Sequence, residues 1–328
     1  MEYRYMPGTS LSLSVLSLGT MQFGGQTSEA DSLKIMDYAF DHGINVFDTA
    51  NIYINGESER IVGKALKGRR DKIVLATKTG TRKSDDINTS GLSRRYIIDS
   101  VENSLKRLNT DFIDIFYLHT PDPDTALEES LETLNTLVKA GKVRYIGVSN
   151  YAAWQIAEMY RICEKNSFVR VSVSQNVYNL LTRSIEPELI PCLETYKVGL
   201  FLYNPIMGGL LTGKHKPGTP DVGTRFSNEH SQANTYFTRY WNDINFDAVE
   251  KLKKIAEEHG LSILELAMKW CLHNTAVTSL IIGASRLSQI EQNIELIKGK
   301  ALDEQVLGKC DELWKSLTGD RFFYVRPR

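Results

Sequence analysis

The chain has 328 residues, 24% of them charged, and a formal net charge of -1. This near-neutral balance gives no indication of a polyanionic partner, so we expect no binding to nucleic acid or to an acidic membrane surface. The first residues lack the apolar core of a signal peptide, and no stretch reaches the roughly 18 apolar residues of a membrane span, so we expect a cytoplasmic protein.

Short segments rich in β-branched and aromatic residues recur along the chain, mostly about 30 residues apart, which is the length of one βα unit. We predict eight strands, at residues 15–20, 45–49, 73–78, 113–119, 144–149, 171–175, 200–204 and 279–283. Between them, apolar residues at helical spacing predict helices, for example at residues 28–42, 93–108, 127–140 and 152–166.

One interval, residues 205–278, is much longer than the others and contains Gly, Pro and aromatic residues before a helix at 246–259 resumes the pattern. We interpret it as a long functional loop after the seventh strand. A further amphipathic helix is predicted at residues 303–317, followed by a basic aromatic tail.

Strand segments such as residues 73–76 are apolar without alternation, as expected when helices cover both faces of a parallel sheet. Eight such units favour an α/β fold of the (β/α)8 TIM-barrel type, in one domain spanning residues 1–328. A doubly wound open sheet usually has a glycine fingerprint after its first strand, and residues 19–25 (GTMQFGG) do not match it.

The four cysteines lie far apart, with no CxxC pair and no histidine at metal-ligand spacing. We therefore expect reduced, mostly buried thiols and no metal site.

In a barrel of this type, the carboxyl ends of the strands surround the active site. Asp48, Lys78 and His119 end the second, third and fourth predicted strands, and Tyr53 follows Asp48 closely. Each residue taken singly also has a structural explanation, such as a salt bridge or a hydrogen-bonded core histidine. Their joint occurrence at consecutive strand ends favours a catalytic interpretation.

The chemistry of these groups fits the reduction of a carbonyl. A free tyrosine has a pKa of about 10 and is a poor acid near neutrality unless a positive charge stabilises its phenolate. Lys78 supplies that charge, Asp48 keeps Lys78 charged and in place, and His119 donates a hydrogen bond to the substrate carbonyl. None of them supplies electrons, so a hydride must come from a cofactor such as nicotinamide.

The sequence here resembles the aldo-keto reductase superfamily over nearly its whole length. The resemblance lies in residues 45–50 (NVFDTA) with Tyr53, 76–78 (ATK), 114–119 (DIFYLH) and 141–150 (GKVRYIGVSN). It implies that Asp48, Tyr53, Lys78 and His119 form the catalytic tetrad. Residues 149–154 (SNYAAW), 175–179 (QNVYN), 204–214 (NPIMGGLLTGK) and 289–293 (QIEQN) are similar to the aflatoxin-aldehyde and succinic-semialdehyde reductase branch.

Residues 208–214 also match the spacing of a phosphate-binding loop, G-x-x-x-x-G-K. His215 stands where such a loop has the Ser or Thr that holds magnesium, which argues against a nucleoside triphosphatase. The backbone amides of the same loop are suited to a pyrophosphate, which is the role that the resemblance implies.

The resemblance further implies that Ser149, Asn150 and Gln175 bond the nicotinamide carboxamide and that Tyr203 packs on its ring. Past the eighth strand, Arg286 and the start of a helix are suited to an adenosine 2′-phosphate, which favours NADPH over NADH. The similar branch has serine rather than arginine at this position. The remaining expected NADPH/NADP+ contacts are Asn204, Pro205, Gly208, Gly209, Leu210, Gly213, Lys214, Arg225, Gly283, Ser285, Gln289, Gln292 and Asn293.

Arg239 and Arg326 resemble arginines that face the substrate in the similar branch. With Tyr53 and His119 they would contact a small carbonyl compound, and two guanidinium groups favour aldehydes that carry a carboxylate or a phosphate.

Two other functional classes stay open. Some members of the superfamily bind NADPH but serve as regulatory subunits, like potassium-channel β subunits, and such a protein would bind the cofactor with little turnover. A cofactor-free barrel hydrolase or isomerase would bind no NADPH at all. The sequence does not determine the oligomeric state.

Overall fold

The computed structural model describes residues 1–81, 88–227 and 233–318. These residues divide into two compact units. The first consists of Met1–Asn176, Glu188–Leu202 and Ala276–Ile294, and the second of Val177–Pro187, Tyr203–Thr275 and the chain from Glu295 onward. The prediction that residues 1–328 form a single domain stays a prediction.

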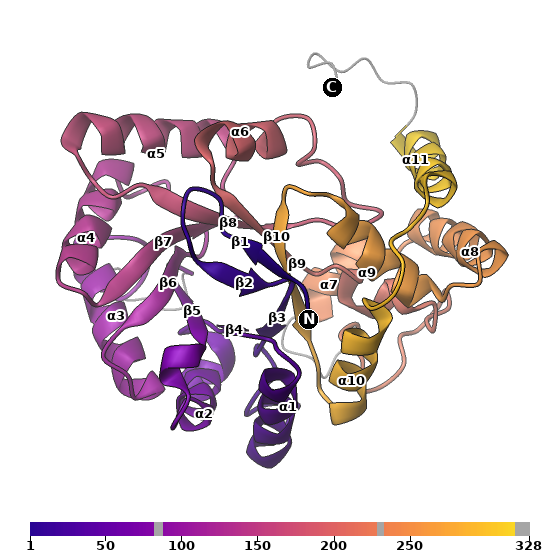
Figure 1. The fold of residues 1–328 in the computed structure, drawn as a ribbon, viewed down its shortest axis with the longest axis horizontal. Helices are drawn as coiled ribbons and strands as arrows, with labels where there is room; N and C mark the ends of the chain where they lie inside the picture. The colour runs from indigo at the N-terminus through magenta and orange to yellow at the C-terminus, as the bar shows by residue number, and fades with distance from the viewer. Residues whose placement is uncertain (82–87, 228–232, 319–328) are drawn as a thin grey trace. The chain divides into compact units, whose positions relative to one another are not determined.

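The first unit is built on a closed barrel of parallel strands, and the predicted (β/α)8 fold is confirmed (Figure 1). Each predicted strand overlaps an observed one. In chain order the barrel strands are β3 (Leu16–Gly19), β4 (Val46–Asp48), β5 (Val74–Thr79), β6 (Ile113–Leu118), β7 (Val143–Ser149), β8 (Val171–Val177), β9 (Gly199–Tyr203) and β10 (Val277–Gly283).

Helices surround these strands. The predicted ones are present as α1 (Glu29–Asp41), α3 (Arg94–Leu108), α4 (Leu127–Lys139) and α5 (Ala153–Asn166). No bounds were predicted for the 3-10 turns η1 (Tyr53–Gly56) and η2 (Arg70–Lys72) or for the helices α2 (Glu57–Ala65) and α6 (Leu189–Tyr196), and the helix start expected past the eighth strand is that of α10 (Leu287–Leu296).

Local sequence explains where several helices begin and end. The Ser28 and Ser93 hydroxyls cap α1 and α3 by accepting hydrogen bonds from the backbone N–H of Asp31 and Tyr96. Asn109 ends α3 in the left-handed conformation, which asparagine tolerates better than most residues. All residues of β5 and β6 are buried, because barrel side chains fill one face of each strand and helices cover the other.

A two-stranded hairpin that was not predicted, β1 (Tyr3–Tyr5) and β2 (Ser12–Ser14), precedes the barrel. Its residues bond to chain segments at the amino ends of barrel strands: the side chain of Asn45 bonds to β2, and Arg4 donates to the carbonyl oxygen of Val277. The hairpin therefore lies at the amino-terminal end of the barrel, which leaves the carboxyl ends of the strands for the site (Figure 1).

The second unit contains the long interval after the seventh strand, which is more helical than predicted. It holds the 3-10 turn η3 (Met207–Thr212) and the helices α7 (Ala233–Tyr240), α8 (Asp243–Glu258) and α9 (Ile263–His273). Only α8 was predicted. The helix α11 (Glu304–Thr318), which packs on α8, confirms the predicted C-terminal helix.

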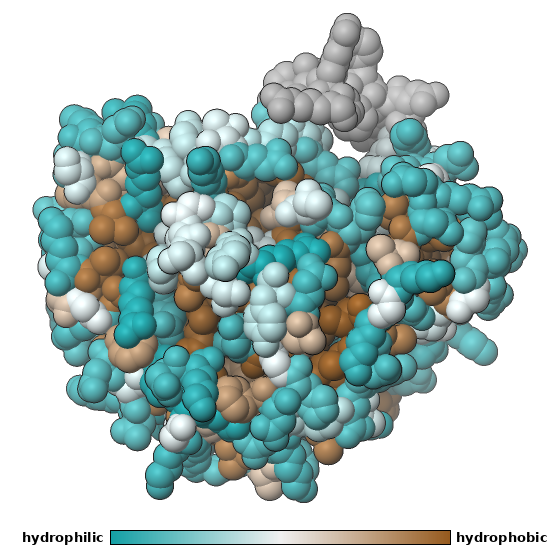
Figure 2. Space-filling view, viewed as in Figure 1, coloured by the Kyte–Doolittle hydropathy of each residue, from teal (hydrophilic) through white to brown (hydrophobic). Residues whose placement is uncertain are grey.

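All four cysteines are free thiols, and three of them are buried, as predicted. Helices that are long and apolar enough to cross a bilayer do not occur among the described residues. On the face that Figure 2 shows, the outer surfaces of the peripheral helices are mainly hydrophilic, and hydrophobic residues lie between them.

Candidate active site

Strand register brings three of the four predicted catalytic residues to one face of the barrel. Asp48 pairs with Ala76, and Lys78 lies two residues further along β5 and therefore points to the same side. Lys78 in turn pairs with Tyr117, and His119 lies two residues beyond Tyr117. These side chains thus share the barrel interior at the carboxyl ends of their strands.

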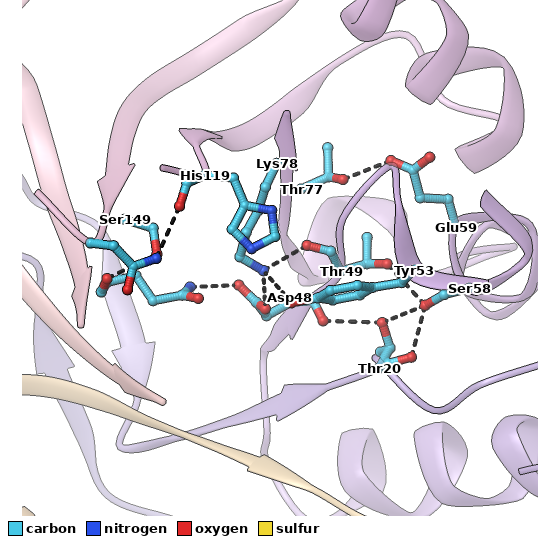
Figure 3. Close-up of polar contacts among 12 residues, drawn as sticks. Thr20, Asp48, Thr49, Tyr53, Ser58, Glu59, Thr77, Lys78, His119 and Ser149 are labelled. Carbon is cyan, nitrogen blue, oxygen red and sulfur yellow. Dashed lines mark hydrogen bonds and ion pairs between the residues drawn. The ribbon is translucent and has the colours of Figure 1, made fainter. Parts of the chain in front are cut away.

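Lys78 is the centre of the observed cluster (Figure 3). Its ammonium nitrogen is 2.5 Å from Asp48 Oδ1, 2.7 Å from the carbonyl oxygen of Thr49 and 3.5 Å from the hydroxyl oxygen of Tyr53. The Lys78 side chain is fully buried and that of Asp48 is nearly so. The three ammonium protons therefore each have an acceptor, one of which is the tyrosine.

Lys78 is charged in this environment. Burial by itself lowers its pKa, but the negative charge of Asp48, together with smaller contributions from Tyr53, outweighs burial and raises the pKa above the usual 10.5. A permanent positive charge next to the Tyr53 hydroxyl favours the phenolate, which is the condition for tyrosine to act as an acid.

His119 is neutral. Burial, and then the positive charge of Lys78, lower the pKa of its imidazole to about 3. The Nδ1 atom is buried without a hydrogen-bond partner among the described residues, so we assign the single ring proton to Nε2. The His119 ring lies edge-on to that of Tyr53, with centroids 6.1 Å apart, and the two rings thus adjoin one another at the barrel mouth.

Tyr53 stands at the start of a turn with unusual backbone geometry. The three residues that follow it, Ile54, Asn55 and Gly56, all have positive φ, at 45°, 54° and 87°. The left-handed conformation is strained for a β-branched residue such as Ile54 and costs on the order of 1–3 kcal/mol. Surrounding contacts must therefore hold this turn in place.

One set of such contacts involves Ser58, near the start of α2. Its hydroxyl is within 3.0 Å of the hydroxyls of Thr20 and Thr49 and donates to the carbonyl oxygen of Thr20. Thr20 also bonds the carbonyl oxygen of Asp48. This network fastens the segment after Tyr53 to the ends of β3 and β4 (Figure 3).

A second contact set involves Glu59, whose side chain is fully buried. Its carboxylate accepts hydrogen bonds of 2.6 Å from both Thr77 and Arg107. Thr77 precedes Lys78 on β5 and therefore points away from the barrel interior toward α2. Ser58 and Glu59 were not predicted from the sequence, although two polar residues at the start of a short helix after Tyr53 were a signal that α2 exists.

The residues expected at the nicotinamide carboxamide lie together at the ends of β7 and β8. Ser149 pairs with Gln175 in register, and its hydroxyl donates to the Gln175 carbonyl oxygen at 3.0 Å. Asn150, with φ of 64°, bonds through its amide nitrogen to Ser149 and to the carbonyl oxygen of His119. Gln175 also donates to Asp48, which was not predicted.

The residues expected at the adenosine end lie around the start of α10. Ser285 bonds through both its backbone N–H and its hydroxyl to the side-chain oxygen of Gln289. Arg286 is exposed beside them and has no carboxylate at ion-pair distance within the described part of the chain. An exposed guanidinium next to a helix N-terminus fits a phosphate group. Of the other candidates here, Asn293 is buried, whereas Gly283 and Gln292 are exposed.

The second unit holds the glycine loop. Gly208, Gly209 and Gly213 all have positive φ, and a side chain at Gly208 would lie 2.8 Å from the Tyr236 ring. Asn204 fixes the loop by accepting a hydrogen bond of 2.6 Å from the Gly208 backbone N–H. Such a backbone fits the cradle that a pyrophosphate requires. The candidates Tyr203, Pro205, Leu210 and Lys214 flank or belong to the same segment.

The predicted arginines of this unit have different surroundings. Arg225 donates a hydrogen bond of 2.9 Å to the Tyr236 hydroxyl. Arg239 is exposed on α7. Arg326 lies outside the described residues.

The fold places the cluster around Lys78 at the carboxyl ends of the strands of a closed parallel barrel, where barrel enzymes have their active sites. The model of the aldo/keto reductase family matches residues 15–315, and the chain belongs to this family. The resemblance found in the sequence is thereby confirmed. Members of the family are oxidoreductases that generally use NAD(P)H.

Individual relatives cover nearly the whole chain. A protein named probable voltage-gated potassium channel subunit beta, from Arabidopsis thaliana, is 35% identical over 90% of this chain and 91% of its own. Aflatoxin B1 aldehyde reductase member 2 from Homo sapiens is 34% identical over 90% of this chain and 85% of its own. The uncharacterized oxidoreductase YrpG from Bacillus subtilis is 35% identical over 98% of both chains.

Proposed function

We propose that the protein uses NADPH to reduce an aldehyde or ketone to the alcohol, with Tyr53 as the proton donor. The observation that carries this proposal is the contact between the Tyr53 hydroxyl and the buried ammonium of Lys78, at 3.5 Å, with Asp48 behind it. A phenol beside a fixed positive charge is an acid that works near neutral pH.

The cofactor, when bound, supplies a hydride to the carbonyl carbon. As negative charge develops on the carbonyl oxygen, the Tyr53 hydroxyl transfers its proton to that oxygen. Lys78 then stabilises the Tyr53 phenolate that remains, and Asp48 holds the Lys78 ammonium in place. His119, neutral with its proton on Nε2, donates a hydrogen bond to the same oxygen and orients the substrate.

The test is Tyr53→Phe, which removes the proton donor and little else. We expect kcat to fall by roughly 10²- to 10⁴-fold, with NADPH affinity nearly unchanged, because the hydroxyl acts in the transition state. Steady-state NADPH oxidation with a panel of aldehydes measures the first quantity, and cofactor titration the second.

The matched control is Tyr160→Phe, the same substitution on α5, where the hydroxyl bonds the carbonyl oxygens of Val171 and Tyr196. It should leave turnover unchanged. If Tyr53→Phe weakens cofactor binding as much as it lowers turnover, the assignment of Tyr53 as general acid is wrong.

The preference for NADPH over NADH belongs to the same proposal and rests on Arg286 and the start of α10. We expect Arg286→Ala to weaken NADPH binding by about tenfold, as for the loss of a charge-assisted hydrogen bond, and to leave NADH binding nearly unchanged. Equal loss for both cofactors would contradict a role for Arg286 at the 2′-phosphate.

The other cofactor contacts stay proposals with different support. Ser149, Asn150 and Gln175 are supported by their clustering next to His119, and the glycine loop by its left-handed backbone. Arg225 and Lys214 rest on the resemblance alone. The same holds for Arg239 and Arg326 as contacts of a carboxylate- or phosphate-bearing aldehyde.

A second candidate function is a regulatory subunit that binds NADPH with little turnover. The relatives named potassium channel subunit beta favour it, because their identity to this chain equals that of the named reductases or slightly exceeds it. The intact tetrad favours the reductase. A protein that binds NADPH but oxidises it with none of a broad aldehyde panel would support the regulatory function.

A further inference from the structure

His215 directly follows the glycine loop, residues 208–214, and its side chain is packed inside the second unit. Only 3% of the residue is exposed. Its ring meets those of Phe226 and Trp241 edge-on, with centroids 5.1 and 5.6 Å away. The two aromatic rings therefore hold the imidazole in a defined position next to the loop.

Neither ring nitrogen of His215 has a hydrogen-bond partner among the described residues. Buried polar atoms in proteins are nearly always bonded, so a buried side chain with two unbonded nitrogens needs an explanation. A neutral imidazole has one N–H donor and one acceptor, whereas a phenylalanine would pack against the same rings and leave no polar atom unbonded. The imidazole is therefore suited to holding a ligand rather than to packing alone.

Nε2 is the ring nitrogen of His215 that faces the glycine loop. A Cβ atom at Gly209 would lie 3.4 Å from Nε2, and beyond its chain neighbours no other atom of the described residues would lie within 4 Å of it. At Gly208 and Gly213 the corresponding positions are closed, by an aromatic ring at 2.8 Å and by a lysine side chain at 2.6 Å. Gly209 thus leaves room beside it, and this room adjoins an unbonded imidazole nitrogen.

The hydrogen bonds of the loop leave a place for this nitrogen in anion binding. The backbone N–H groups of Gly208 and Gly209 already donate within the loop, to Oδ1 of Asn204 and to the carbonyl oxygen of Ile206. An anion beside Gly209 therefore needs a further donor. Nε2 of His215 supplies one at the distance from Gly209 that a bound oxygen atom requires.

The charges around His215 keep its ring neutral in the absence of an anion. Burial first, and the positive charge of Lys214 second, lower the pKa of the imidazole to about 4, and the opposing effect of Asp221 is smaller. Two more cations of this unit, Arg225 and Lys253, are bonded to a tyrosine hydroxyl and to a carboxylate. A negative phosphate at Nε2 favours the imidazolium and so raises the pKa again.

We propose that His215 is a further ligand of the phosphate group at the glycine loop, to which it donates a hydrogen bond through Nε2, and that phosphate binding is thereby linked to protonation of this ring. The proposal rests on the proposed function for the identity of the phosphate, which is the pyrophosphate of the cofactor. The cofactor contacts expected from the sequence do not include His215.

The direct test follows the ¹⁵N signals of the His215 ring between pH 7.5 and 4.5, with and without saturating cofactor. The signals are identified by their loss in His215→Gln. NADP+ serves as the probe because, unlike NADPH, it is stable in acid. We expect NADP+ to raise the pKa of His215 by at least about one unit, as an adjacent negative charge does. An unchanged pKa overturns the proposal.

Affinity at pH 7.5, measured by calorimetry, gives a second readout. His215→Phe keeps an aromatic ring but has no N–H, and it should weaken NADP+ binding about tenfold, as for the loss of a hydrogen bond to a charged group. His215→Gln keeps an amide N–H donor and should lose less.

The matched control ligand is adenosine 2′-monophosphate, which carries the phosphate expected at Arg286 but no pyrophosphate. His215→Phe should bind it as tightly as the unaltered protein does. Equal NADP+ affinity in His215→Phe and the unaltered protein overturns the proposal, and so does an equal loss for both ligands. If His215→Phe does not fold, the pKa measurement on the unaltered protein decides.

Failure of the proposed function is distinguishable from failure of this proposal. If NADP+ does not bind the unaltered protein, the proposed function fails, and inorganic pyrophosphate then replaces NADP+ as the probe. A pKa of His215 that rises with pyrophosphate supports the phosphate site independently of the cofactor, whereas a pKa that stays the same overturns it.

Discussion

At the residue scale, charge decides which proton each group of the site holds. Lys78 and His119 lie in the same buried cluster, yet one is held charged and the other neutral. Asp48 neutralises Lys78 by direct contact, whereas burial and then the positive charge of Lys78 keep His119 neutral by lowering its pKa. The cluster therefore contains one fixed cation, one anion and two neutral donors, which suits it to protonating a carbonyl oxygen.

A prediction at this scale concerns pH. Because the pKa of His119 is lowered to about 3, its imidazole stays neutral throughout the range in which a free histidine titrates. The pH profile of kcat/KM for carbonyl reduction should consequently show no inflection from His119 between pH 5 and 8. Proton NMR of the His119 ring tests this directly, since a ring that titrates near 6.5 would contradict a neutral donor at neutral pH.

At the element scale, the segment from η1 through α2 determines where Tyr53 lies. Its left-handed turn is strained, and the hydroxyl network of Ser58 and the buried carboxylate of Glu59 hold it against β4 and β5. Packing adds to this, because α2 approaches the end of α3 so closely that a side chain at Gly63 would lie 2.6 Å from the carbonyl oxygen of Leu108.

The prediction for this element is that Gly63→Ala destabilises the protein even though alanine favours helices. Replacing glycine by alanine lowers the entropy that the backbone loses on folding, which stabilises the protein by at most about 1 kcal/mol. The clash of the new side chain with the fixed backbone of α3 costs about 1–3 kcal/mol. The matched control is Gly308→Ala in the middle of α11, where a side chain meets no atom within 4 Å, so this variant should gain stability. Urea denaturation measures both, and equal effects would contradict close α2–α3 packing.

At the scale of the whole molecule, two histidines with lowered pKa values link stability to pH. The pKa of His215 is lowered to about 4, by burial first and by Lys214 second, and that of His119 to about 3. Both bind protons more readily when unfolded, since an unfolded histidine has a pKa of about 6.5. The contribution of these two histidines to the free energy of unfolding is therefore largest above pH 6.5, and it decreases as the pH falls toward 4.

The test replaces His215, which packs against Phe226 and Trp241, with phenylalanine. His215→Phe should reduce the loss of unfolding free energy between pH 7.5 and 5, as measured by denaturant titration at each pH. The control is His42→Phe, the same substitution at the exposed C-terminal end of α1. An unchanged pH dependence in His215→Phe would contradict a buried neutral imidazole.

The sequence by itself determined the barrel and placed the tetrad candidates at one of its ends. The eight strands repeat at a local spacing, and Asp48, Lys78 and His119 stand at strand ends where the βα rhythm places them at one mouth. Short-range patterns of this kind can be recognised in the sequence alone. No bounds were predicted for α2 and α6, which are short, or for α7 and α9, which lie in an interval without that rhythm.

Only the tertiary structure decided how the candidate catalytic groups are held. The contact of Gln175 with Asp48 joins residues 127 positions apart, and that of Glu59 with Arg107 joins residues 48 positions apart. The left-handed turn after Tyr53, with isoleucine in a conformation that its own propensity disfavours, is likewise imposed from outside the segment. Contacts and strain of this kind depend on which distant segments the closed barrel brings together, and no local sequence pattern encodes them.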